Sequence, residues 1–180
     1  EALPVILGRD TPVKYLILFQ NNMELRPTGG FIGSFALVTF KEGRLMDLNV
    51  SDVYTADGQL KGYVEPPSPI KTYLGEANWF LRDSTWDPDF PSSANTAEWF
   101  LEKEIGESVD GVVAVDLEFA RGLIEEVGPI YLSDFEKEID SDNLYEITQY
   151  EVEKDFFPGS QKKATFLTAL AKELMNELIN

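Results

Sequence analysis

The chain has 180 residues, of which 43% are hydrophobic and 12% aromatic, so it is long and apolar enough to fold around a core of its own. Its net charge of -17 argues against nucleic acid and anionic lipid surfaces as partners, because both are bound through cationic surfaces. The absence of cysteine and histidine excludes disulfides, zinc–thiolate sites, cysteine nucleophiles and imidazole bases, which leaves carboxylates, Lys, Arg, Tyr, Ser or Thr and oxygen-bound cations for any chemistry.

The first part of the chain predicts three neighbouring strands. Residues 14–19 and 33–40 are short apolar segments, rich in aromatic and β-branched residues and bounded by turn residues, as buried strands are. A tight turn at residues 41–43 leads into a third strand near residues 44–50. Residues 51–69 are expected to be irregular, and a short helix is expected over residues 70–75.

A long loop is predicted over residues 76–92. Four aromatic side chains lie in it: Trp79, Phe80, Trp86 and Phe90. Because aromatic rings are seldom left exposed to water in such number, we expect this loop to pack against the body of the protein, beside a groove.

The second half predicts helices that alternate with strands. A helix capped by Ser92 or Ser93 runs to Ile105, and Asp116 caps another helix that ends at Gly128. Strands are expected over 109–115 and 129–132, an exposed acidic stretch over 133–140, and two further helices from Ser141 to about residue 154 and from Ser160 onward.

The order strand, helix, strand between residues 109 and 132 predicts a right-handed crossover and a parallel strand pair. The fold class predicted for the whole is α/β: a single three-layer α-β-α domain over residues 1–180, whose mixed central sheet is antiparallel at the front and parallel behind.

The first candidate site is the polar loop 21–33, which follows the first strand at the edge where open α/β sheets usually bind ligands. Its glycines could offer backbone N–H groups to an anion, and its arginine could add a bidentate grip. The candidate ligand-binding residues are Asn21, Asn22, Glu24, Thr28, Gly29 and Gly30, and Arg26 is a candidate catalytic residue. The alternative is an ordered connection in which Arg26 pairs with Glu24 or another acid.

The second candidate site lies within residues 81–90. Arg82 and Asp83 stand beside Asp87 and Asp89, and such a group could bind Mg²⁺ and orient a phosphate against it. The site residues predicted here are Arg82 and Asp83 for catalysis, and Asp83, Asp87 and Asp89 for the metal. The alternative is an Asp-Pro turn with an aromatic plug and a local ion pair.

The third candidate is the pair Lys162 and Lys163 in the first turn of the last predicted helix. Two cations there oppose the helix dipole, and either an anionic partner or an ion pair with the acidic stretch 134–155 explains them. Of the five arginines, only Arg26 and Arg82 lie in the polar loops described above, so we expect these two to be the ligand-binding cations.

Three segments, residues 21–33, 82–91 and 109–116, resemble a family of bacterial envelope proteins of unknown function, whose members often carry an amino-terminal membrane anchor. That family is distantly similar to the LytR-CpsA-Psr group, enzymes that move glycopolymers from a lipid-linked pyrophosphate carrier onto peptidoglycan with arginines, aspartates and a divalent cation. The resemblance implies an extracytoplasmic domain at the cell surface, with an anchor upstream of Glu1.

The resemblance carries over to particular positions and fails at others. Arg26 stands where those enzymes have an Arg-Ser-Asp-Thr motif, but Thr28 and Gly29 occupy the place of its catalytic aspartate. Gln161-Lys162-Lys163 stands near their carboxyl-terminal arginine–glutamine motif, with lysines in place of arginine. Tyr150, Glu151 and Glu153 occupy a segment where the enzymes place arginine.

Two hypotheses follow. In the first, the protein is a Mg²⁺-dependent phosphotransferase in which Arg26 and Arg82 hold a pyrophosphate, and a deep apolar tunnel for the polyprenyl chain lies beside them. In the second, the protein is a non-catalytic envelope module that binds a wall polymer or a protein. The second predicts that both arginines form internal ion pairs and that no lipid-sized cavity exists.

Overall fold

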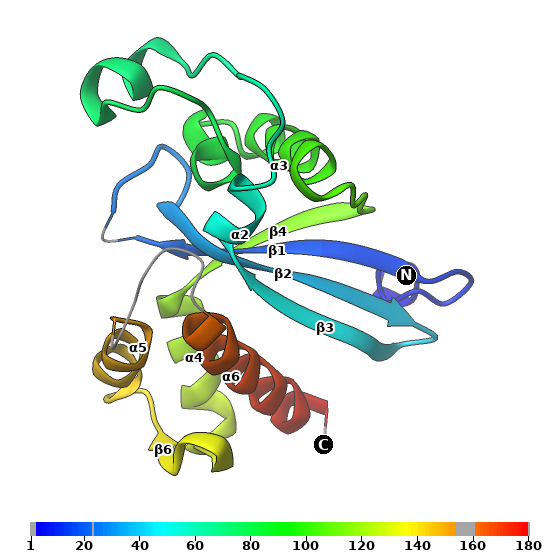
Figure 1. The fold of residues 1–180 in the computed structure, drawn as a ribbon. Coiled ribbons are helices and arrows are strands. Elements are labelled where there is room, and N and C mark those ends of the chain that lie inside the picture. The colour runs from blue at the N-terminus through cyan, green and yellow to red at the C-terminus, as the bar shows by residue number, and fades with distance from the viewer. Residues whose placement is uncertain (1–2, 23, 154–160, 180) are drawn as a thin grey trace.

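The structure is a computed structural model that describes residues 3–22, 24–153 and 161–179. A four-stranded mixed sheet lies at its centre (Figure 1). Its strands lie in the order β3-β2-β1-β4. Antiparallel pairing joins β1 to β2 and β2 to β3, whereas β1 and β4 run parallel. The strands are β1 (Val13–Asn21), β2 (Phe31–Lys41), β3 (Arg44–Asp52) and β4 (Gly111–Asp116).

Helices cover both faces of this sheet, which confirms the predicted three-layer α/β fold with its mixed sheet (Figure 1). On one face lie α2 (Val53–Asp57), a π-helical turn (Ile70–Leu74), a 3-10 segment η2 (Leu81–Trp86) and α3 (Phe90–Ile105). On the other face lie α4 (Leu117–Val127), α5 (Leu144–Glu153) and α6 (Gln161–Ile179). The remaining elements are α1 (Leu3–Ile6), β5 (Ile130–Leu132), a 3-10 turn (Ser133–Phe135) and β6 (Lys137–Ile139).

The two faces of β1 meet different surroundings, because successive strand residues point to opposite sides. Leu16 and Leu18 are fully buried in a core shared with α3, which includes Phe100 and Leu101. The alternate residues of β1 face α4, α5 and α6. Those helices form a second core together with β5 and β6, and a cavity that is described below lies between the helices and the sheet.

Several of the predictions about elements are wrong, among them the exposed stretch 133–140, which contains β6 with a buried Ile139. The cap of α3 is Asp89, whose carboxylate accepts a hydrogen bond from the Ser92 backbone, so Ser92 and Ser93 lie inside the first turn. Strand β5 pairs antiparallel with β6 in a separate two-stranded sheet, and the parallel partner of β4 is β1. The segment expected to be irregular contains α2, which Asp52 caps.

Candidate functional site

The loop between β1 and β2 is ordered by contacts within the protein. The Gln20 side-chain amide donates to the Thr28 carbonyl at 2.6 Å, and the Thr28 hydroxyl donates to the Thr85 carbonyl at 2.9 Å. Gly30 has φ of +129°, and a Cβ there would lie 2.1 Å from the Asn21 carbonyl oxygen. Glycine at position 30 is therefore explained by steric crowding, without any ligand.

The two arginines singled out in the sequence meet at one carboxylate. Nε of Arg26 donates to Oδ1 of Asp83 at 2.9 Å, and Nε of Arg82 lies 3.5 Å from Oδ2 of the same residue. Arg82 also bonds Asp57 and Glu76, each at 2.7 Å. The arginine side chains are 11% and 12% exposed and Asp83 is 2% exposed, so this is a buried ion-pair network.

Aromatic rings cover the charged groups of this network. The Arg26 guanidinium lies 5.3 Å from the centre of the Phe31 ring, and that of Arg82 lies 4.3 Å from the centre of the Phe80 ring. This geometry matches the interpretation of an ordered connection in which Arg26 pairs with an acid of the chain. The acid is Asp83, not Glu24, which instead accepts a hydrogen bond from Asn21.

Buried carboxylates near the network have unusual proton affinities. Burial raises the pKa of Asp57 to about 6, against the opposing effect of Arg82. Burial also raises the pKa of Glu104, on α3, to about 8, with a smaller contribution from the charge of Asp57. Since Glu104 accepts a hydrogen bond from the Leu81 backbone at 3.1 Å, it holds η2 against α3.

The magnesium site predicted from Asp83, Asp87 and Asp89 does not form. Asp83 is bound to the arginines, Asp87 accepts from the Asp89 backbone at 2.8 Å, and Asp89 caps α3. No group of three or more carboxylates among the described residues lies close enough together to hold a metal ion. Magnesium binding itself stays a prediction, and these three residues do not fit it.

The third candidate is only partly described. Lys162 and Lys163 fall in the first turn of α6, as expected, but their side chains lie outside the described part of the structure. Their proposed partners therefore stay predictions. Within the described residues, no helix is both long and apolar enough to cross a membrane.

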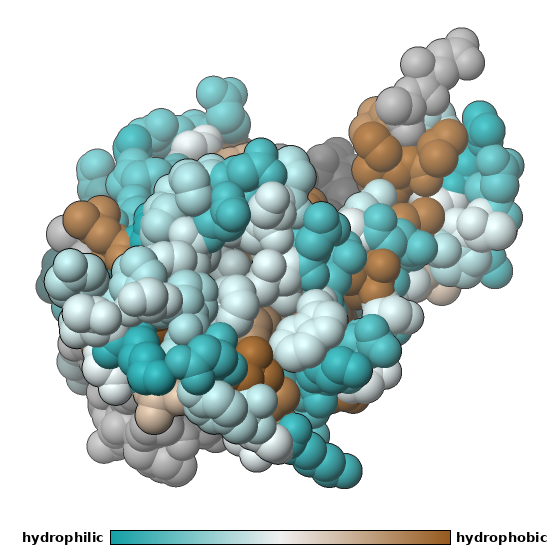
Figure 2. Space-filling view, turned by 90° about the horizontal axis from the view of Figure 1, so that it is seen from above, coloured by the Kyte–Doolittle hydropathy of each residue, from teal (hydrophilic) through white to brown (hydrophobic). Residues whose placement is uncertain are grey.

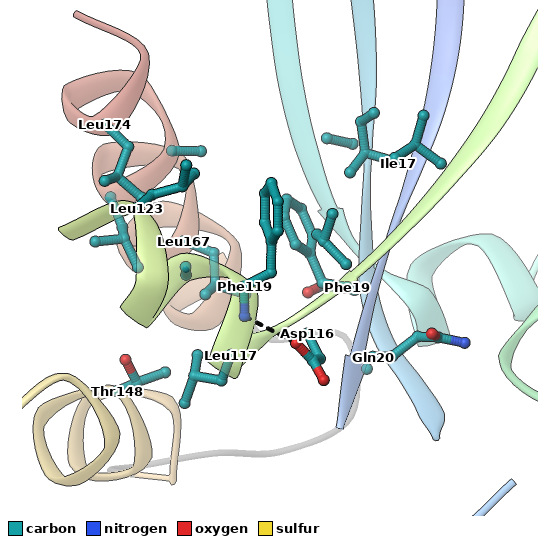
Figure 3. A pocket seen from close by; sticks show the side chains of 18 of the residues that line it. Ile17, Phe19, Gln20, Asp116, Leu117, Phe119, Leu123, Thr148, Leu167 and Leu174 are labelled. Atoms are coloured by element: carbon teal, nitrogen blue, oxygen red, sulfur yellow. Dashed lines mark hydrogen bonds between the residues drawn. The ribbon is translucent and has the colours of Figure 1, made fainter. Parts of the chain in front are cut away.

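An apolar cavity of about 500 Å³ lies between the sheet and α4, α5 and α6 (Figure 3). Ile17 and Phe19 of β1 face it from the sheet, and Leu123 and Leu174 face it from the helices (Figure 3). Two apolar side chains that line it are also well exposed, Val113 at 42% and Phe119 at 55%, so they lie where the cavity meets solvent.

One end of this cavity is polar. Gln20 at the end of β1 pairs in register with Asp116 at the end of β4, and α5 brings Tyr145 and Thr148 to the same end. The Tyr145 hydroxyl donates to the Asn22 side chain at 3.0 Å, and that side chain donates to Asp116 at 3.4 Å. The far end, beside the turn between β2 and β3, is lined by Phe40, Leu45 and Leu48. The cavity is therefore polar at one end and apolar along the rest, which matches the distribution of polarity in an amphiphilic ligand.

The predicted site residues are divided between these two places. Asn21 and Asn22 line the cavity, whereas Arg26, Arg82 and Asp83 are not among its lining residues. Sequence reasoning identified Asp116 only as a helix cap, which it is, and missed its place at the polar end together with Tyr145, Thr148 and Phe119. Of these residues, only Phe119, an aromatic residue in the first turn of α4, gives a sign of a binding site in the sequence, and that sign is weak.

Solved structures of other proteins share this fold. Lin1025 of Listeria innocua aligns with a TM-score of 0.56 at 14% identity over 94% of this chain, and TagV of Bacillus subtilis with 0.53 at 14% over 93%. Lmo1026 of Listeria monocytogenes aligns with 0.52 at 12% identity over 94%. This chain spans 66%, 63% and 66% of those three structures, respectively.

These neighbours confirm the LytR-CpsA-Psr resemblance at the level of the fold. No curated protein matches the sequence. A family described as proteins of unknown function, DUF4012, matches residues 10–152, which is most of the chain. The chain therefore belongs to the DUF4012 family.

Proposed function

We propose that the protein is a cell-envelope domain, related to glycopolymer transferases, that binds the apolar chain of a lipid-linked glycopolymer in the cavity between the sheet and α4, α5 and α6. The cavity carries this proposal. Its volume of about 500 Å³ falls within the range of small-molecule sites, roughly 300–1,000 Å³. The fold shared with TagV and Lin1025 supports the relation to transferases.

The distribution of polarity supports a lipid with a polar head. An isoprenoid or acyl chain that enters this cavity is removed from water, at about 0.8 kcal/mol for each buried CH₂. Asn22, Asp116 and Tyr145 then lie where the head group would stay in contact with hydrogen-bonding groups. The polymer would extend outward from this end.

The arginine network supports a binding function over transfer. Since Arg26 and Arg82 are neutralised by Asp83, Asp57 and Glu76, they have no free charge to stabilise a leaving phosphate. A pyrophosphate would have to displace these buried carboxylates. The paired arginines fit the second hypothesis of the sequence analysis, but the apolar cavity is one that this hypothesis did not predict. We therefore propose a non-catalytic, extracytoplasmic lipid-binding module, in which Arg26 and Arg82 are structural.

The test is an NMR titration of the protein, carrying isotope-labelled methyl groups, with farnesol. The largest changes in methyl chemical shift are expected for the leucines and valines that line the cavity, such as Val113, Leu123 and Leu174. The variant Ala171→Phe, which fills part of the cavity, should weaken binding at least about tenfold, or about 1.4 kcal/mol. Ala77→Phe, at an exposed alanine outside the cavity, is the matched control.

Two results would contradict the proposal. One is the absence of saturable methyl shifts with farnesol in the unmodified protein. The other is equal farnesol affinity in the Ala171→Phe and Ala77→Phe variants, which would place the ligand elsewhere.

A further inference from the structure

A second cavity, of about 360 Å³, lies on the other side of the sheet from the first and is formed by η2, the start of α3 and the segment around Pro67. Figure 2 views this side of the molecule and shows a mostly hydrophilic surface. The residues that line the cavity are Pro67, Trp79, Ser84, Trp86, Asp87, Pro88 and Thr96. It lies beside the aromatic loop for which the sequence predicts a groove.

The apolar part of this cavity consists of rings. Trp79 and Trp86 are both half-buried. The indole N–H of Trp79 donates to the Asp83 carbonyl at 2.9 Å, and its ring packs against Phe100 at 5.3 Å. Trp79 is thus fixed in place with its polar atom already bonded, so it can offer a ligand only its ring.

The polar part consists of hydroxyls and one carboxylate. Asp87 is exposed, and Thr96 lies on α3 with its hydroxyl bonded to the Ser92 carbonyl. Ser84 is 1% exposed, and its Oγ has no hydrogen-bond partner among the residues that the structure describes. That oxygen is closed off from the cavity, so the exposed Asp87 carboxylate is the polar group that a ligand meets.

We propose that this tryptophan-lined cavity binds a neutral saccharide. A sugar ring has a face of C–H groups, which packs on indole and proline rings, and an edge of hydroxyls, which bond to carboxylate and hydroxyl groups. Trp86 packs against the sugar ring, and Asp87 accepts hydrogen bonds from its hydroxyls.

The negative charge of the cavity and of the whole protein favours a neutral sugar over an acidic one. Among the described residues that line the cavity, Asp87 is the only charged one, and none is a lysine or an arginine. An anionic saccharide would meet repulsion from Asp87 and from a molecule with a net charge of -17. This proposal does not depend on lipid binding, because no residue that the structure describes lines both cavities.

The test uses tryptophan fluorescence, because the chain has three tryptophans and two of them line the cavity. In a Trp99→Phe background, titration with the neutral trisaccharides maltotriose and triacetylchitotriose should give a saturable change with at least one of them. Trigalacturonic acid, which is anionic, should give none. Trp86→Ala should lower the affinity at least about tenfold, or about 1.4 kcal/mol, measured by calorimetry.

One control separates recognition from folding. Trp99→Ala removes a 42% exposed tryptophan of α3 that does not line the cavity, and it should keep full affinity.

Absence of a saturable response to both neutral sugars overturns the proposal. It is also overturned by equal losses of affinity in Trp86→Ala and Trp99→Ala. Farnesol binding by Trp86→Ala is expected to be unchanged, so failure here and failure of the lipid proposal can be told apart.

Discussion

Arg26 and Asp83, which are 57 residues apart in the chain, form an ion pair of 2.9 Å that is almost completely shielded from water. This pair joins the loop after β1 to η2. A buried charge that loses its partner is strongly destabilising, whereas a pair replaced by apolar residues often is not.

Asp83→Asn is expected to lower the free energy of unfolding by about 3–5 kcal/mol, because it leaves the Arg26 charge uncompensated in a buried position. Urea denaturation monitored by circular dichroism measures this. The double variant Arg26→Met/Asp83→Leu should recover much of the loss. Asp47→Asn, at an exposed position on β3, is the control and should change stability by less than about 0.5 kcal/mol. Equal effects of Asp83→Asn and Asp47→Asn would show that the network contributes nothing.

Glu104 makes stability depend on pH. Its pKa is raised from 4.5 to about 8 in the folded protein, so folding favours the protonated form. The resulting stabilisation is complete below pH 4.5 and is lost as pH rises toward 8, at about 1.4 kcal/mol for each pH unit. Glu104→Gln should remove this decline and be more stable than the unmodified protein at pH 9.

The measurement is a series of urea denaturations from pH 5 to pH 9. Glu102→Gln, an exposed residue of the same helix, is the matched control and should keep the decline. Parallel pH profiles for Glu104→Gln and the unmodified protein would show that Glu104 ionises normally.

Gly30 and Gly43 both have positive φ, of +129° and +77°, but differ in their surroundings. A Cβ at Gly30 would strike the Asn21 backbone, whereas one at Gly43 would meet nothing within 4 Å. Gly43→Ala should therefore cost only about 1 kcal/mol of backbone strain, and Gly30→Ala clearly more. The melting temperatures of the two variants, measured by thermal denaturation, give the comparison. Equal melting temperatures would argue against the close packing of this loop.

Asp116 is the only charged residue among the described residues that line the apolar cavity. If a lipid head group lies at this end, Asp116→Asn should raise affinity for farnesyl diphosphate several-fold and leave that for farnesol unchanged, because it removes repulsion between like charges. Asparagine also caps helices, so α4 should be retained. Calorimetry with the two ligands gives the comparison, and an equal change for both would exclude a head group near Asp116.

Much of the fold was predictable because it depends on local patterns. Strands β1, β2 and β3 and the helix α4, with Asp116 at its start and Gly128 at its end, follow from apolar periodicity and capping residues. The pairing of β5 was not predictable in this way, because a three-residue strand carries little signal and its partner β6 lies in a stretch that looked acidic and exposed.

The candidate site was predictable only in part. The sequence marks Arg26 and Arg82 as unusual, but their role depends on Asp57, which lies in a segment expected to be irregular. The apolar cavity arises from the spacing between two layers, and its lining residues look like ordinary core residues in the sequence. Spacing of this kind is a property of tertiary packing and leaves no local pattern.

The internal neutralisation of Arg26 and Arg82 has a consequence for kinetics in solution. With these cations paired in the interior, surplus carboxylates dominate the outer field of a molecule with a net charge of -17. Dissolved salt shortens the reach of that field, to about 8 Å at physiological ionic strength. Encounters with a polyanion should accordingly become faster as ionic strength rises, the opposite of what an open cationic groove would produce.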